Sequence, residues 1–192
     1  MITGEFAVGE SSDYRCRKLC VDDLENVMHW RMLPHVTQFM NTDPVLTLEG
    51  QYKWFEKLSS KGEIFQWIVH VDDKPCGVIN LDDFDLSNKR CSWGYYIAEK
   101  SLRSFNLAVA LEMSIYDYVF NQLKLNKIIG ETFCINTAAI KMHELCGCTT
   151  EGVLRQHIIK NGQLYDICIQ TMLAEEWSRI NVNIEYQHID FS

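Results

Sequence analysis

The clearest indication of the fold comes from one stretch of this chain, Ile129-Gly-Glu-Thr-Phe-Cys-Ile-Asn136-Thr-Ala-Ala-Ile-Lys-Met-His-Glu-Leu-Cys-Gly147-Cys148. A short apolar run ends at Asn136, and asparagine is a favoured residue for capping the N-terminus of a helix. Gly147 follows about three turns later, at 3.6 residues a turn, where glycine commonly ends a helix. We therefore predict a strand over 128–134 and, directly after it, a helix from 136 to 145.

The segments on either side show alternating strand-like and helix-like patterns. Asn161-Gly162 lies between two apolar runs and predicts a two-residue hairpin turn, because both positions favour positive φ. Residues 34–43 predict only short helix and loop. The remaining patterns predict strands at 14–20, 64–71, 76–82, 91–98, 152–160 and 163–173, and helices at 22–31, 47–58 and 106–120.

This order of elements indicates an α/β fold of the α+β kind. Adjacent hairpins predict a largely antiparallel sheet, and one β-α-β crossing makes it mixed. The chain has 192 residues, of which 47% are hydrophobic, which is enough for one compact core. We predict a single domain over 1–192 with its core at about 14–177, and we expect residues 178–192, which carry no clear pattern, to form a flexible tail.

Composition narrows the functional classes. No apolar run approaches the roughly 20 residues that cross a bilayer, and the first residues lack the build of a signal peptide. We therefore expect a soluble, cytoplasmic protein without a membrane partner. The net charge of −8 argues against nucleic acid as a partner, because a phosphate backbone attracts basic surfaces.

The eight cysteines raise the question of a disulfide framework or a zinc site. Cys16 and Cys20, like Cys146 and Cys148, are close pairs, but neither has the C-x-x-C spacing of a zinc knuckle. The others lie in apolar, strand-like runs, where a reduced cysteine behaves as a small hydrophobe. We expect free thiols in a reducing compartment and no metal.

The opening stretch also carries a motif, Asn136-x-x-Ala139-Ile-x-x-His143-Glu-x-x-Gly147. It resembles the pattern that closes the acetyl-CoA site in the GCN5-related N-acetyltransferase (GNAT) superfamily. The resemblance implies a seven-stranded, mostly antiparallel sheet with flanking helices and a V-shaped splay between its central strands. It also implies transfer of an acetyl group from acetyl-CoA to an amine, with His143 where most of the superfamily has Tyr.

The resemblance extends to the cofactor site. The superfamily holds the CoA pyrophosphate with backbone amides of a Gln/Arg-x-x-Gly-x-Gly/Ala loop, and Arg103-Ser-Phe-Asn-Leu-Ala108 corresponds to it, with Asn106 in place of glycine. A helix N-terminus attracts phosphate, although an ordinary capped helix without a ligand remains the alternative. The strand before it runs beside the pantetheine arm in the superfamily. The implied cofactor-binding residues are Tyr96, Ile97, Ala98, Arg103, Ser104, Phe105, Asn106, Leu107, Ala108, Asn136 and Ala139, where Asn136 is alternatively a simple helix cap.

The chemistry needs a neutral amine and a proton for the departing thiolate. A CoA thiol should titrate near a free cysteine, at about 8.5, whereas Tyr titrates near 10 and His near 6.5. An imidazolium at His143 is therefore a plausible acid, the alternative being a packed histidine with water as the proton source. Glu131 is the candidate base, and Asp82 or Asp83 could serve instead or bind the acceptor's ammonium.

The front of the chain suggests the acceptor. His29-Trp-Arg-Met-Leu-Pro-His-Val36 and Gln51-Tyr-Lys-Trp-Phe55 resemble the 4-amino-sugar N-acetyltransferases of the pseudaminic-acid pathway, whose substrate is a UDP-linked 4-amino-4,6-dideoxy-N-acetylhexosamine. Met32 replaces an Asn of that branch, and Gln51 replaces a His seen in some members. The implied acceptor-binding residues are Arg31, whose guanidinium can take phosphate bidentately, and Gln51, Trp54 and Asp82. Arg31 is alternatively a structural anchor, and Trp54 alternatively packs in the core.

Three other readings of function and assembly stay open at this point. The chain could be an acetyltransferase for protein N-termini of the ribosomal-protein type, because the hairpin over 151–166 is shared with that group. It could be a non-catalytic acyl-CoA-binding module, given Asn106 and His143. A homodimer is compatible with either reading.

Overall fold

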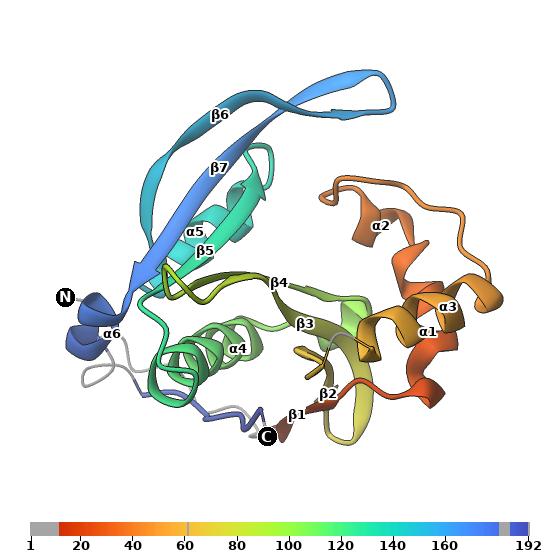
Figure 1. Ribbon diagram of the computed structural model, residues 1–192, viewed down its shortest axis with the longest axis horizontal. Coiled ribbons are helices and arrows are strands. Elements are labelled where there is room, and N and C mark those ends of the chain that lie inside the picture. The colour runs from red at the N-terminus through yellow and green to blue at the C-terminus, as the bar shows by residue number, and fades with distance from the viewer. Residues whose placement is uncertain (1–11, 61, 181–184, 192) are drawn as a thin grey trace.

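The computed structural model describes residues 12–60, 62–180 and 185–191 (Figure 1). Within these ranges, seven strands form a mixed sheet with helices on both faces. The strands are β1 (Tyr14–Lys18), β2 (Gln66–Val71), β3 (Lys74–Asp85), β4 (Arg90–Ile97), β5 (Lys127–Phe133), β6 (Thr149–Lys160) and β7 (Gln163–Leu173). The α-helices are α1 (Leu24–Arg31), α2 (Pro34–Thr37), α3 (Leu48–Ser59), α4 (Phe105–Asp117), α5 (Thr137–Leu145) and α6 (Ala174–Ile180). Two 3₁₀ turns (Val21–Asp23, Lys100–Leu102) and a π-helical turn (Tyr118–Gln122) complete them.

The strand order is β1-β2-β3-β4-β5-β7-β6, and every neighbouring pair is antiparallel except β4–β5. The predicted mixed, mostly antiparallel sheet is thereby confirmed. Asn161 and Gly162 join β6 to β7 with φ values of 51° and 77°, the conformation that the Asn-Gly pair predicts.

The parallel pair β4–β5 is short, and its end creates the main opening of the molecule. Its register runs only from Arg90 opposite Lys127 to Trp93 opposite Gly130. Beyond Trp93, β4 continues to Ile97 paired with β3 alone, and beyond Gly130, β5 continues to Phe133 paired with β7 alone. The two central strands therefore separate, and the predicted V-shaped splay is confirmed.

The two faces of the sheet bury separate hydrophobic clusters because successive side chains of a strand point to opposite faces. Trp67 and Trp93 pack in the larger cluster, on the side of α4. Ile68 and Tyr96 pack in the smaller one, which α1, α2 and α3 cover. Helices thus lie on both faces of the splayed strands.

Helix α4 is buried on almost every side, and the C-terminal segment covers part of it. Its sequence is apolar nearly all round, which is typical of a helix that other elements enclose. The backbone N–H of Ile189 donates to Ser114 Oγ (2.9 Å), and Trp67 Nε1 donates to the carbonyl of Phe191 (2.9 Å). Ile189 and Phe191 are each only 1% exposed. The expectation of a flexible tail is therefore wrong for residues 185–191. Residues 178–180 belong to α6. Residues 181–184 and 192 lie outside the described part of the chain.

The tip of the β6–β7 hairpin is tied to the segment that follows α2. Lys160, which is buried, donates from Nζ to the carbonyl of Thr37 (2.6 Å) and lies 2.9 Å from Asp43 Oδ1. Asn161 Nδ2 donates to Asp43 Oδ2 (2.6 Å). In Figure 1 the hairpin extends beyond the rest of the sheet toward that segment. We call Thr37, Asp43, Lys160 and Asn161 the hairpin clamp.

Some element boundaries differ from those predicted. Strand β3 runs to Asp85, beyond the expected end at 82, through a register irregularity against β4. Strand β6 begins at Thr149 instead of 152, and α6 was not predicted. Irregular pairing and short helices leave weak periodic signals in a sequence, which explains these differences.

Candidate active site

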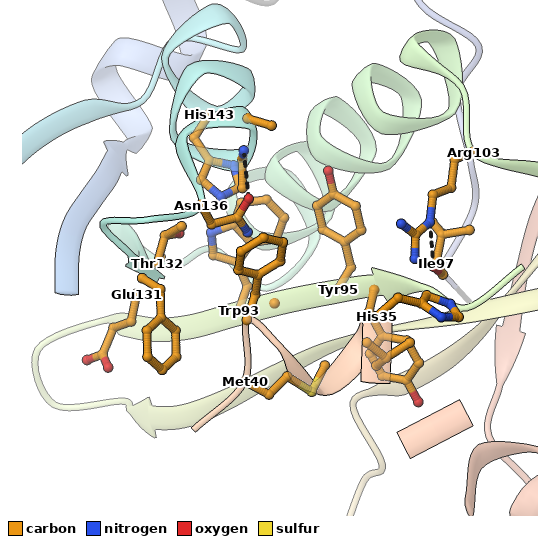
Figure 2. A pocket seen from close by; sticks show the side chains of 18 residues that line it. His35, Met40, Trp93, Tyr95, Ile97, Arg103, Glu131, Thr132, Asn136 and His143 are labelled. Carbon is orange, nitrogen blue, oxygen red and sulfur yellow. Dashed lines mark hydrogen bonds between the residues drawn. The ribbon is translucent and has the colours of Figure 1, made fainter. Parts of the chain in front are cut away.

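A cavity of about 340 Å³ occupies the gap between the separated ends of β4 and β5 (Figure 2). Its walls are the second half of β4, the end of β5 with the start of α5, and α2 with the residues after it. A smaller cavity of about 200 Å³ lies at the start of α4, and Tyr95, Ile97 and Arg103 line both. The splay therefore provides a site with two adjoining compartments.

His143 reaches the larger cavity from α5. Asn136 begins that helix by accepting from the N–H of Ala139 (3.4 Å), and the helix ends before Gly147, whose φ is 97°. The His143 ring is buried, and it packs edge-on against Trp93 with ring centroids 5.1 Å apart. Figure 2 shows His143, Asn136 and Trp93 around the same side of the cavity.

Sequence reasoning missed the partner of His143, which is Glu112 on α4. Its Oε1 lies 3.0 Å from His143 Nδ1 and accepts from the Tyr95 hydroxyl at 3.2 Å, while Oε2 accepts from the Tyr116 hydroxyl at 3.0 Å. Glu112 is fully buried. A signal for it existed, because Glu112 is the one charged residue between 105 and 116. A lone charge on an enclosed helix needs partners.

Burial keeps the two tyrosines protonated. Desolvation, followed by the charge of Glu112, raises the pKa of Tyr95 well above its usual value of about 10. The same two causes raise the pKa of Tyr116 well above that value. Both hydroxyls therefore act toward Glu112 as donors.

Glu131, the predicted base, lines the cavity from the opposite side of β5. Gly130 pairs with Gln170, whose side chain donates to the Ile140 carbonyl of α5 (3.1 Å), so this face of β5 carries α5. Because strand side chains alternate, Glu131 projects from the other face. Its carboxylate points away from His143 in Figure 2. The structure thus brings both predicted catalytic residues to one cavity, on different sides of it.

The predicted pyrophosphate loop lies at the N-terminus of α4. Ser104 caps the helix, accepting from the N–H of Leu107 at 3.1 Å. Arg103, Ser104, Leu107 and Ala108 line the smaller cavity, whereas Phe105 and Asn106 are exposed and line neither cavity. The first turn of a helix presents N–H groups without intrahelical acceptors, so this end can bind an anion.

Arg103 also fixes the end of β4. Its Nε and Nη2 both donate to the Ile97 carbonyl, at 2.9 and 2.6 Å (Figure 2). The N–H of Ala98 donates to Cys76 on the β3 side. Main-chain groups alternate along a strand, so Tyr95 and Ile97 direct theirs toward the gap while Tyr96 and Ala98 direct theirs toward β3. Of the predicted residues Tyr96, Ile97 and Ala98, Ile97 alone directs its backbone toward the gap, and its carbonyl there is the one that Arg103 binds.

The predicted acceptor residues are less close to the cavity. Arg31 contacts the sulfur of Met40, which lines the cavity, but Arg31 itself does not line it. Gln51 is buried in α3, and Trp54 packs in the cluster beneath α1 and α3. Asp82 lies outside the cavity and accepts from Asn80.

Helix α2 and the residues after it line the cavity with side chains that were not among the predicted site residues. His35 Nε2 lies 2.8 Å from the Ala98 carbonyl, which fixes its ring at the rim of the cavity. Val36, Phe39 and Met40 form an apolar wall beside it. The short helix α2, which begins at Pro34, and the turn that follows it place these side chains there.

In the part of the chain that the structure describes, no group of three or more His, Cys, Asp or Glu side chains is placed to hold a metal ion. In the same residues, no helix is long and apolar enough to span a bilayer. All eight cysteines are free thiols.

Comparison with known proteins identifies the family of this chain. The model of the acetyltransferase (GNAT) domain family matches residues 15–149. "Uncharacterized N-acetyltransferase p20" of Bacillus licheniformis is 27% identical over 167 residues, covering 84% of this chain and 93% of its own. Acetyltransferase PseH of Campylobacter jejuni is 28% identical over 122 residues, covering 64% and 74%.

A solved structure agrees in fold. Spermidine N-acetyltransferase from Vibrio cholerae, in complex with CoA and spermine, superposes with a TM-score of 0.80 at 19% identity, covering 86% of this chain and 98% of its own. At that identity the likeness establishes the fold alone. With a family match across most of its length and a cavity at the splay of its central strands, this chain belongs to the GNAT acetyltransferase family and is an acyltransferase that uses acetyl-CoA.

Proposed function

We propose that the enzyme acetylates the 4-amino group of a UDP-linked 4-amino-4,6-dideoxy-N-acetylhexosamine. The observation that carries the proposal is the composition of the acceptor wall. Val36, Phe39 and Met40 face the cavity, and Glu131 is the one carboxylate among its lining residues. Similarity to PseH in the matched region supports the same acceptor class.

This wall suits a deoxy sugar better than a polyamine. A polyamine carries several ammonium groups, which call for several carboxylate partners, whereas the lining offers one. A 6-deoxyhexose has a methyl group that an apolar wall can cover and a single amine for Glu131. Arg31, held at Met40 just behind the wall, is the candidate for a nucleotide phosphate.

The cofactor would lie along the gap, with its pyrophosphate at the start of α4. The N-terminal amides around Ser104 and the cavity beside Leu107 and Ala108 would receive the diphosphate. The pantetheine arm would pair with the gap-facing backbone of Tyr95 and Ile97 as an added strand. Asn136, whose Oδ1 caps α5, would offer its Nδ2 group to the arm.

The reaction would be direct transfer in a ternary complex. Glu131 takes the proton that leaves the acceptor ammonium, directly or through water, and the neutral amine then attacks the thioester carbonyl. The C–S bond breaks as the new C–N bond is completed. The attacking nitrogen passes its second proton to His143, on the opposite side of the cavity, which delivers it to the CoA sulfur.

An acceptor screen tests the proposal. The purified protein is incubated with acetyl-CoA and, separately, with the UDP-4-amino sugar, spermidine, and a peptide carrying a ribosomal-protein N-terminus. Mass spectrometry should show a mass gain of one acetyl group on the sugar nucleotide, with a kcat/KM at least tenfold above the others. Turnover on the peptide or spermidine alone would reject the sugar, and CoA binding without any turnover would indicate a non-catalytic module.

A further inference from the structure

Glu112 is a carboxylate with no access to solvent in the middle of helix α4, and its neighbours from Leu107 to Met113 are all apolar. Burying an ionised carboxylate costs several kcal/mol unless donors surround it. Three hydrogen bonds reach it from His143, Tyr95 and Tyr116, and the Cys146 thiol adds a fourth contact. This cluster touches the active-site cavity through His143 and Tyr95.

We propose that Glu112 is a positioning residue that keeps a proton on Nδ1 of His143 and thereby makes Nε2 the atom that carries a proton from the acceptor amine to the CoA sulfur. This inference rests on the proposed acetyl transfer at this cavity. It does not depend on which amine is the acceptor.

The tautomer follows from the chemistry of the pair. An ionised carboxylate only accepts hydrogen bonds, so the nitrogen 3.0 Å from Glu112 Oε1 must carry a hydrogen. In the neutral ring Nε2 then has a lone pair, and it is the nitrogen left for the cavity that His143 lines. Edge-on packing against Trp93, at an interplanar angle of 64°, holds the ring in this orientation.

The proton balance of the transfer can be completed with this one nitrogen. Attack by the neutral amine on the thioester forms a C–N bond and a tetrahedral centre with a positively charged nitrogen. Nε2 takes one proton from that nitrogen, and the ring becomes an imidazolium. As the C–S bond breaks, Nε2 returns the proton to sulfur, which leaves the amide and free CoA thiol. Nitrogen and sulfur are bonded to the same carbon, so both lie within reach of one imidazole.

The surroundings of the ring make Glu112 the group that stabilises the imidazolium. Its α4 neighbour Tyr116 and its β4 neighbour Tyr95 stay protonated because burial raises their pKa. Burial also raises the pKa of the Cys146 thiol, and that of Cys148 to about 12. The other charged side chains at the cavity, and its second histidine, come from other elements: Glu131 from β5, Arg103, which is bound to the Ile97 carbonyl, and His35, which is bound to the Ala98 carbonyl.

The first experiment reads the tautomer in the unmodified protein. Long-range ¹H–¹⁵N spectra distinguish Nδ1–H from Nε2–H imidazoles, and a His143→Gln difference spectrum assigns the signal among the six histidines. Neutral His143 should carry its proton on Nδ1. A neutral ring with its proton on Nε2 would overturn the inference. No acceptor is needed, so this outcome is separate from any failure of the acceptor screen.

The second experiment uses Glu112→Gln, which keeps the shape and an acceptor oxygen but removes the charge. With the acceptor that the screen identifies, kcat should fall on the order of 10²-fold while the KM for acetyl-CoA stays within about twofold. The acid limb of the pH–rate profile should move to lower pH, because the imidazolium has lost its stabilising charge.

Tyr116→Phe is the matched control. It removes another hydrogen bond to the same carboxylate and the contact with Cys148, but it leaves the Glu112–His143 pair. Its acid limb should stay in place even if the protein is less stable. If the acid limb of the pH–rate profile does not move in Glu112→Gln, or moves equally in Tyr116→Phe, Glu112 has only a structural role and the proposal is refuted.

Discussion

Trp93 and Gly130 form the last register pair of the parallel ladder between β4 and β5, and the active-site cavity begins immediately beyond them. A Cβ atom on Gly130 would lie 3.3 Å from Trp93 Nε1 and 3.6 Å from the Gln170 carbonyl. Trp93 also packs against the rings of His143 and Tyr116. The absence of a side chain at Gly130 therefore allows Trp93 to hold the His143 side of the cavity in place.

Replacing Gly130 with Val should displace Trp93 and disturb the His143 ring behind it. Overpacking of this kind costs about 1–3 kcal/mol of stability. We expect a lower Tm and weaker binding of CoA by calorimetry. Gly152→Val is the control, because a Cβ there meets nothing within 4 Å. Equal losses in the two variants would contradict this account of Gly130.

Replacing His143 with Phe should lower kcat on the order of 10²-fold and leave the affinity for acetyl-CoA nearly unchanged, because the proton carrier is lost while the apolar packing is retained. Steady-state kinetics and calorimetry measure the two quantities. His29→Phe, whose side chain is 62% exposed, is the matched control and should behave as the parent enzyme. Unchanged turnover in His143→Phe would assign proton delivery to water.

Replacing Lys160 with Met should release the hairpin clamp. The buried Thr37 carbonyl loses its donor, which costs about 1–3 kcal/mol. Since the clamp holds the segment next to the acceptor wall, we expect a higher KM for the acceptor and an unchanged KM for acetyl-CoA. Lys53→Met removes an exposed pair with Glu49 and should change neither constant. A rise in the acetyl-CoA KM alone would place the effect elsewhere.

The clamp should also open in acid. Hydrogen bonds from Lys160, then from Asn161 and Thr37, hold the pKa of Asp43 at about 2. A carboxyl whose pKa is lower in the folded state contributes stability above its ordinary pKa of about 4, and that contribution is lost as the pH falls toward 2. Protection factors of the amides at the hairpin tip, which remove the pH dependence of intrinsic exchange, should therefore fall between about pH 4 and pH 2. In Asp43→Asn, these protection factors should be lower at neutral pH and should not change across this window.

Replacing Phe191 with Ala should destabilise the protein by about 3–5 kcal/mol, because this ring is buried against Trp67 and Tyr118. Chemical denaturation measures the loss, and a single cooperative transition would agree with one domain. Leu86→Ala, at a side chain that is 72% exposed, should cost almost nothing. A small loss in Phe191→Ala would show that the C-terminal segment does not contribute to the core in solution.

Local sequence determined the elements and their order. The Asn136–Gly147 helix, the Asn161–Gly162 turn and the strands over 64–98 were predictable because their signals lie within a few residues of one another. The motif over 136–147 likewise identified the family, and the family implied both the sheet and its splay. His143 and Glu131 could be selected because each lies at a fixed place relative to that motif.

Tertiary structure alone decided the partners that meet across long sequence separations. Glu112 and His143 are 31 residues apart, Lys160 and Thr37 are 123 apart, and Trp67 and Phe191 are 124 apart. No periodicity in the chain encodes such pairs, because each depends on how two elements pack once the sheet has formed. A lone glutamate in an apolar helix and an irregular C-terminal segment gave only the hint that something must cover them. In the folded protein, Glu112 is paired with His143, and the C-terminal segment packs against α4.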